Sequence, residues 1–199
     1  MSKLTVFMLA AFFVFAACNN NKTREATIVS EDGKSKITID PTSNTADQAS
    51  EMEKKMEELK KLTPMTTEQL KALLPEELMG MKRTNFNATS AMGWGSANAT
   101  YRNEGDEKKF EVNIIDCAGE AGSGIWTLNY WTKMSYESEN EDGYSKTVNF
   151  NGQKAVESYH KYNDQHEITY TSGDRLLVTV KGEKTGVDAV KQVANSLKL

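Results

Sequence analysis

Histidine and cysteine are scarce in this sequence, which contains two of each among its 199 residues. Two histidines leave few candidates for a general base, the role that histidine fills most often in enzymes. Clusters of lysine and arginine are also missing, and the 28 acidic residues outnumber the 24 basic ones, which argues against a nucleic-acid partner. No long apolar run occurs after residue 17. The sequence therefore predicts a water-soluble domain behind one apolar segment.

That apolar segment runs from Leu4 to Ala17, fourteen residues without a charge, and Lys3 precedes it. A transmembrane helix needs about 20 apolar residues, so the segment is short for a permanent span. A positive start, an apolar centre of about 7–15 residues and small residues at the end are typical of a secretory signal peptide. Here the small residues are Ala16 and Ala17, and Cys18 follows them.

The stretch "FMLAAFFVFAACNNNK" resembles the signal of a bacterial lipoprotein. The resemblance implies cleavage before Cys18, attachment of a diacylglycerol to its thiol, and a place in the cell envelope. Phe15 stands where such a signal usually carries leucine or another aliphatic residue. Asn19 differs from the aspartate of an inner-membrane retention signal, so the resemblance favours the outer membrane. Two alternatives stay open: an ordinary signal peptide beside an unrelated cysteine, and an uncleaved anchor.

The second cysteine, Cys117, has two interpretations. In an exported chain, two cysteines suggest a disulfide, because export leads to an oxidising compartment. If Cys18 carries lipid, Cys117 has no partner, and it then fits a small apolar residue buried at the end of a strand. A reactive thiol is the alternative, although no basic neighbour in the sequence would lower its pKa.

The composition along the sequence divides the chain into four predicted segments. We expect a signal peptide in residues 1–17, a lipidated tether with a possible hairpin at Asp32-Gly33 in residues 18–45, a helical region in residues 46–80, and an α+β domain in residues 81–199. The helical region combines the amphipathic stretch "ADQASEMEKKMEELKKL" with a second helix that Thr66 or Thr67 caps.

Strands and turns dominate the remainder. "KKFEVNIIDCAG" alternates apolar and polar residues, while the aromatic stretch "IWTLNYWTKM" favours a helix because glycines precede it. Residues 144–183 read as four strands, with turns near Asn151-Gly152, Asn163-Asp164 and Gly173-Asp174. "TGVDAVKQVANSLKL" is an amphipathic helix. The predicted fold class is α+β: an antiparallel sheet of consecutive hairpins, with helices packed on one face and a helical region before it.

The order of elements from Val148 to Leu199 resembles the C-terminal half of small exported lipoproteins with a PsbP-like α/β sandwich. The strand "FNGQKAVESY", two further strands ending in "RLLVTVKGE" and the helix "VKQVANSLKL" carry this resemblance. The whole chain also resembles a family of uncharacterised envelope lipoproteins of Gram-negative bacteria. The resemblance implies a fold, and no activity carries over from it.

Few residues suggest chemistry. His160 and His166 lie six apart across a predicted turn, where Asp164 or Glu167 could complete a metal site, although this is not a standard ligand spacing. Exposed histidines near a turn are the alternative. Trp94, between two glycines, suggests either an exposed ring that stacks on a ligand or a core residue, and the core interpretation is favoured. Trp126 and Trp131 are the other predicted core tryptophans.

The sequence thus predicts a membrane-anchored lipoprotein that acts as a binding or interaction module. Its partners are the membrane, through the lipid on Cys18, and an envelope protein or ligand whose identity the sequence does not give. We expect no catalytic activity, cofactor, metal or nucleic-acid partner. Two alternatives stay open: a carrier of a lipid or other apolar ligand in a cavity between sheet and helix, and an enzyme built around His160, His166 or Cys117.

Overall fold

The computed structural model describes residues 26–29, 36–39, 45–129 and 134–199. The predicted signal peptide, Cys18, the Asp32-Gly33 turn and Trp131 lie outside the described residues. The strands on either side of that turn are described, and they pair antiparallel as the hairpin prediction requires.

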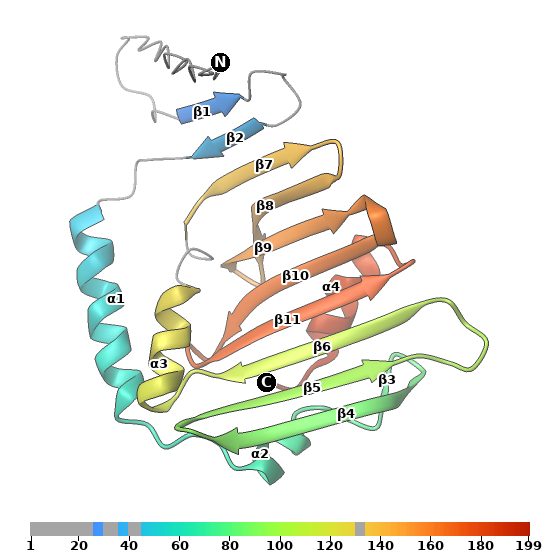
Figure 1. Ribbon diagram of the computed structural model, residues 1–199, viewed down its shortest axis with the longest axis horizontal. Helices are drawn as coiled ribbons and strands as arrows, with labels where there is room; N and C mark the ends of the chain where they lie inside the picture. Colours follow the sequence, from blue (N-terminus) through green and yellow to red (C-terminus); the bar gives the residue numbers. More distant parts are fainter. Residues whose placement is uncertain (1–25, 30–35, 40–44, 130–133) are drawn as a thin grey trace, which may run out of the picture.

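A large antiparallel sheet forms the body of the protein (Figure 1). Within the described residues it has eleven strands, in the order β1-β2-β7-β8-β9-β10-β11-β6-β5-β4-β3. The strands are β1 (Ala26–Val29), β2 (Lys36–Ile39), β3 (Glu77–Leu78), β4 (Met81–Ala91), β5 (Trp94–Tyr101), β6 (Lys109–Asp116), β7 (Tyr136–Asn140), β8 (Gly143–Phe150), β9 (Gln153–His160), β10 (Gln165–Ser172) and β11 (Leu176–Glu183). The mixed α+β composition with a dominant antiparallel sheet is confirmed.

Helices cover both faces of this sheet, so the prediction of helices on one face is wrong (Figure 1). The described helices are α1 (Thr45–Lys60), α2 (Thr67–Ala72), α3 (Gly119–Leu128) and α4 (Val187–Ser196). Helices α2 and α4 pack on one face, and α1 and α3 on the other. The apolar doublets Ile114-Ile115 and Leu176-Leu177 explain this, because successive strand residues point to opposite faces and each doublet supplies an apolar side chain to both.

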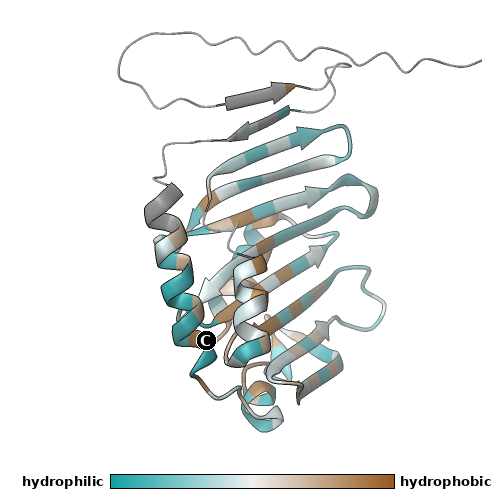
Figure 2. Ribbon diagram, turned by 60° about the vertical axis from the view of Figure 1, so that its left-hand side comes forward, coloured by the Kyte–Doolittle hydropathy of each residue, from teal (hydrophilic) through white to brown (hydrophobic). Residues whose placement is uncertain are grey.

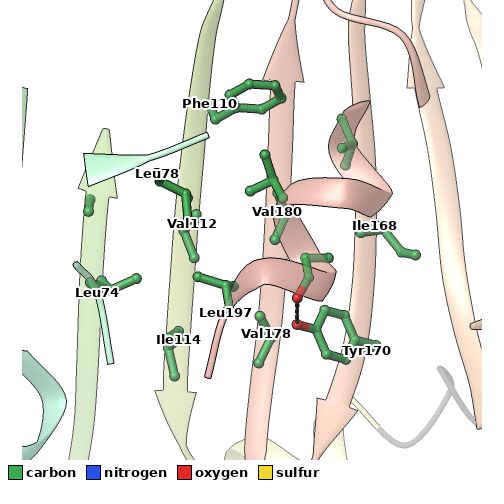
Figure 3. Close-up of a cluster of buried hydrophobic side chains, with 14 of the residues drawn as sticks. Leu74, Leu78, Phe110, Val112, Ile114, Ile168, Tyr170, Val178, Val180 and Leu197 are labelled. Carbon is green, nitrogen blue, oxygen red and sulfur yellow. Dashed lines mark hydrogen bonds between the residues drawn. The ribbon is translucent and has the colours of Figure 1, made fainter. Parts of the chain in front are cut away.

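The larger core lies between the sheet and helices α2 and α4 (Figure 3). Its strand residues alternate with polar ones along β6 and β11, as in Val112, Ile114, Val178 and Val180, all of which are fully buried. The hydroxyl of Tyr170 donates a hydrogen bond of 3.2 Å to the Ala194 carbonyl and so ties β10 to α4. The buried side chains thus fill the space between α4 and the sheet.

The predicted helical region contributes to this same core. Helix α2 begins with a capping box in which the side chain of Thr66 accepts from the Gln69 N–H and the side chain of Gln69 accepts from the Thr66 N–H. Leu70 and Leu74 are then buried in this core, where α2 contacts β4 and β5. Residues 67–78 are therefore part of the folded domain and not a separate layer before it.

Most predicted turns are confirmed. Strands β8 to β11 are the four predicted strands, and the turns between them include Asn151 and Asp174 at positive φ values of 53° and 51°. Helix α3 begins at Gly119, in the glycine-rich stretch before the predicted helix, and ends at Leu128, so only residues 125–128 of the aromatic stretch are helical among its described residues. Met92-Gly93, which the sequence did not single out, also forms a tight turn, with φ values of 54° and 77°. Positive φ at both central residues is the geometry of a type I′ hairpin.

Asp116, at the end of β6, joins three parts of the chain. Its carboxylate accepts hydrogen bonds from Arg175 Nε (2.7 Å) and Nη2 (2.9 Å) and from the N–H groups of Met65 (2.6 Å) and Ala118 (3.1 Å). Arg175 Nη2 also donates to the Thr63 carbonyl at 2.8 Å. Asp116 is fully buried, so these bonds hold the α1–α2 connection and the β10–β11 turn against the end of β6.

Candidate ligand-binding face

Helices α1 and α3 cover only one end of their face of the sheet (Figures 1 and 2). Between these helices and the sheet lies a small apolar cluster of Leu59, Cys117, Trp126 and Leu177. Beyond this cluster, along the same strands, the side chains become polar. The far part of this face is therefore open and hydrophilic.

Strand register arranges the polar side chains of this open part in rows across the sheet. One row runs from Asn98 of β5 through Asn113 of β6 to Thr179 of β11 and Thr169 of β10. The next runs through Glu111, Lys181 and Glu167. We call six residues the polar face: Asn98, Glu111, Asn113, Glu167, Thr179 and Lys181. Together they line a hollow of about 280 Å³.

The charged side chains on and beside the polar face form ion pairs with one another. Lys181 Nζ lies 3.5 Å from a Glu167 oxygen. Lys109 Nζ lies 3.1 Å from Glu111 and 2.9 Å from Glu183, and the pKa of Lys109 is raised, chiefly by its hydrogen bond to Glu183. Three carboxylates thus face two ammonium groups, so the surface has no positive excess that would select an anion.

Uncharged hydrogen-bonding groups also lie on and beside the polar face. The Thr169 hydroxyl donates to Glu167 at 3.2 Å and lies 3.0 Å from the Thr179 hydroxyl. The amides of Asn98 and Asn113 sit opposite each other on paired strands, and each can donate and accept. A ligand that lies on this surface therefore meets donors and acceptors close together.

The polar face was missed from the sequence, although a signal for it exists. In β6 the polar residues Glu111 and Asn113 alternate with core residues, and Thr179 and Lys181 do the same in β11. Such alternation is typical of any strand with one solvent-exposed face, and it does not predict which strands are neighbours in the sheet. The strand order β10-β11-β6-β5 brings these residues together, and this order became known only with the structure.

The two histidines do not meet, so His160 and His166 cannot form the metal site that the sequence left open as an alternative. His160 pairs with Gln165 across the β9–β10 hairpin, and His166 pairs with Tyr159, so the two side chains point to opposite faces of the sheet. The His166 ring stacks on Tyr159 with ring centroids 4.6 Å apart. Among the residues that the structure describes, no three His, Cys, Asp or Glu side chains are placed to hold a metal ion.

Cys117 is buried directly after β6, as predicted for a small apolar residue. Burial is the main cause that raises the pKa of its thiol to about 12, so the thiol stays protonated at neutral pH. His166 lies at the level of Phe110 on β6, and six residues at about 3.3 Å each place Cys117's end of that strand roughly 20 Å away. The residues named for an enzyme site therefore do not converge.

The tryptophans take different positions. Trp126 of α3 is buried, as predicted for a core residue. Trp94 is the first residue of β5, directly after the Met92-Gly93 turn, and it is half-buried. Its ring is thus neither a free aromatic on a loop nor a fully enclosed core residue.

Comparison with protein families, with curated proteins and with solved structures found no match for the chain. In the part of the chain that the structure describes, no helix is long and apolar enough to cross a membrane.

Proposed function

We propose that the protein is a lipoprotein of the cell envelope, anchored through lipid on Cys18 in the outer membrane, and that its folded part is a binding module. One observation carries the binding proposal: the polar face stays uncovered while helices cover both the opposite side and the other end of the same strands. Antiparallel sheets commonly leave one face in water, and here the polar side chains of that face line a hollow.

The chemistry of the polar face favours an uncharged, hydroxyl-rich ligand such as a saccharide. Its own charges are paired, and its amides, hydroxyls and carboxylates both donate and accept. The alternative of a lipid carrier needs an apolar cavity under α4, where Val190 and Val193 are fully buried against the sheet. This packing favours the polar face as the binding surface.

We expect weak binding, because the hollow is shallow and open. A monosaccharide has about 12 non-hydrogen atoms, and at about 0.3 kcal/mol per atom it gains about 4 kcal/mol, which corresponds to a Kd of about 1 mM. Such an affinity suits a ligand that is repeated many times along a polymer, because several weak contacts then act together.

Asn113→Leu is expected to weaken saccharide binding about five- to thirtyfold, because it removes an amide that makes one or two hydrogen bonds of about 1 kcal/mol each. Ligand-observed NMR of the full chain with neutral mono- and disaccharides measures this change. The matched control is Gln192→Leu, an equal change at an exposed position of α4 on the opposite side. If no neutral saccharide binds, or if both variants bind alike, the proposed ligand class is wrong.

A further inference from the structure

The outer edge of β4 is open along most of its length. On one side β4 pairs with β5 from Arg83 to Ala91. On the other side β3 pairs only with Met81 and Lys82, and the Arg83 N–H donates to the Glu76 carbonyl at 2.9 Å. No described strand pairs with this outer side from residue 84 to residue 91. In Figure 1 this strand lies along the lower rim of the sheet.

Hairpin geometry identifies the backbone groups that this edge offers. In a two-residue hairpin the closing pair, here Ala91 and Trp94, exchanges both hydrogen bonds, and every second pair does so after it. The alternate residues Phe86, Ala88 and Ser90 therefore direct their N–H and C=O groups outward. These are the groups that another strand would bind.

The usual protection of an edge strand is missing here. Proteins guard such edges with lysines, prolines, bulges or very short strands. Between Arg83 and Arg102 the sequence has no charged residue and no proline. The register shift of β4 lies between Arg83 and Asn85, at its beginning, so the rest of the strand is regular.

The side chains of β4 indicate what kind of strand fits beside it. Phe86 and Ala88 lie on the α2 side, where they pack against the core but stay half-buried. Asn87 and Thr89 are exposed on the other side, in line with the polar face. A matching strand has apolar residues on one face and uncharged polar residues on the other, and β4 itself has this pattern.

We propose that the outer edge of β4 pairs antiparallel with the same edge of a second copy of this chain. A two-fold axis perpendicular to the sheet makes such a contact self-complementary, and it joins the two sheets into one. The Phe86 and Ala88 side chains of both copies then share one apolar layer. The two polar faces lie on the same side of the joined sheet, which doubles the surface available to a repetitive ligand.

The mass of the full chain in detergent, measured by light scattering over a range of concentrations, tests this pairing. The wild-type protein is expected to have twice the monomer mass. Asn87→Lys is expected to weaken the dimer at least tenfold, because it places two lysines close together across the axis and a charge on the edge. Gln192→Lys, the same change on α4, is expected to leave the dimer intact, and circular dichroism confirms that each variant is folded.

Single cysteines at positions 85, 87 and 89 give a second measurement that does not depend on the lysine variant. Facing positions of an antiparallel pair have Cβ atoms about 4.5–5.5 Å apart. Mild oxidation of membranes is therefore expected to give a disulfide-linked dimer, either between two copies of one variant or between copies of two different variants. Gln192→Cys is expected to give none. A monomeric wild type, a dimer insensitive to Asn87→Lys, or crosslinks only to a different protein would each overturn the proposal.

Discussion

Asp116→Ala is expected to lower the free energy of unfolding by about 3–5 kcal/mol, the usual cost of removing one partner from a buried ion pair. The fully buried carboxylate accepts from Arg175, Met65 and Ala118, so its loss leaves three donor groups without an acceptor. For a domain of this size, a loss of 3–5 kcal/mol lowers the melting temperature by about 6–20 °C. Thermal and urea unfolding of the full chain measure both quantities.

A matched control is Glu58→Gln on α1, which removes a surface ion pair to Lys55 at 3.5 Å. Exposed pairs of this kind contribute about 0–1 kcal/mol, so the control is expected to unfold close to the wild type. A change below about 1 kcal/mol for Asp116→Ala would contradict the structural role given to this carboxylate.

The same carboxylate makes stability depend on acid. Burial raises the pKa of Asp116, but the hydrogen bonds from Arg175, Met65 and Ala118, together with the Arg175 charge, lower it by more, so the pKa lies below its ordinary value. Its contribution is complete above about pH 4 and is lost as the pH falls through the folded-state pKa. Urea unfolding between about pH 5 and 2 is expected to show a smaller loss for Asp116→Asn than for the wild type.

Cys18→Ser is expected to move the protein from the membrane fraction to the soluble fraction and to abolish labelling by a fatty-acid analogue. Each buried methylene of an acyl chain contributes about 0.8 kcal/mol to membrane binding, so losing the attached chains removes nearly all of the affinity. After residue 17 the sequence offers no other long apolar run that could replace them. Fractionation of cells and in-gel detection of the label measure the change.

The other cysteine gives the control for this experiment. Cys117→Ala changes a thiol that is buried in the cluster with Leu59 and Trp126, and it is expected to leave membrane attachment and labelling as they are. Labelling that persists in Cys18→Ser, or that disappears in Cys117→Ala, would contradict the assignment of the anchor.

Local chemistry made much of the fold predictable. Asn151-Gly152 and Gly173-Asp174 favour tight turns, and the strands between them, β9 and β10, follow from alternation of apolar and polar residues. The burial of Cys117 at a strand end also followed from the sequence. In each case the deciding interaction lies within a few residues along the chain.

Long-range pairing explains what the sequence did not show. The position of α1 and α3 on the face opposite α4 depends on the pairing of Ile115 with Leu177 across β6 and β11. The polar face depends on the register of the same two strands. The turn between the two histidines could have brought them together, yet the pleat places their side chains on opposite faces of the sheet. Met92-Gly93 was missed because methionine is not a usual residue at positive φ.

The proposed binding surface is the open polar face. Amide and side-chain NMR of the isotope-labelled full chain, recorded while a neutral saccharide is added, tests it residue by residue. We expect the signals of Asn98, Asn113, Thr179 and Lys181 to shift together with one Kd, while those of Val190 and Val193 under α4 stay fixed. Shifts confined to the α4 side, or no shifts at saturating saccharide, would contradict this proposal.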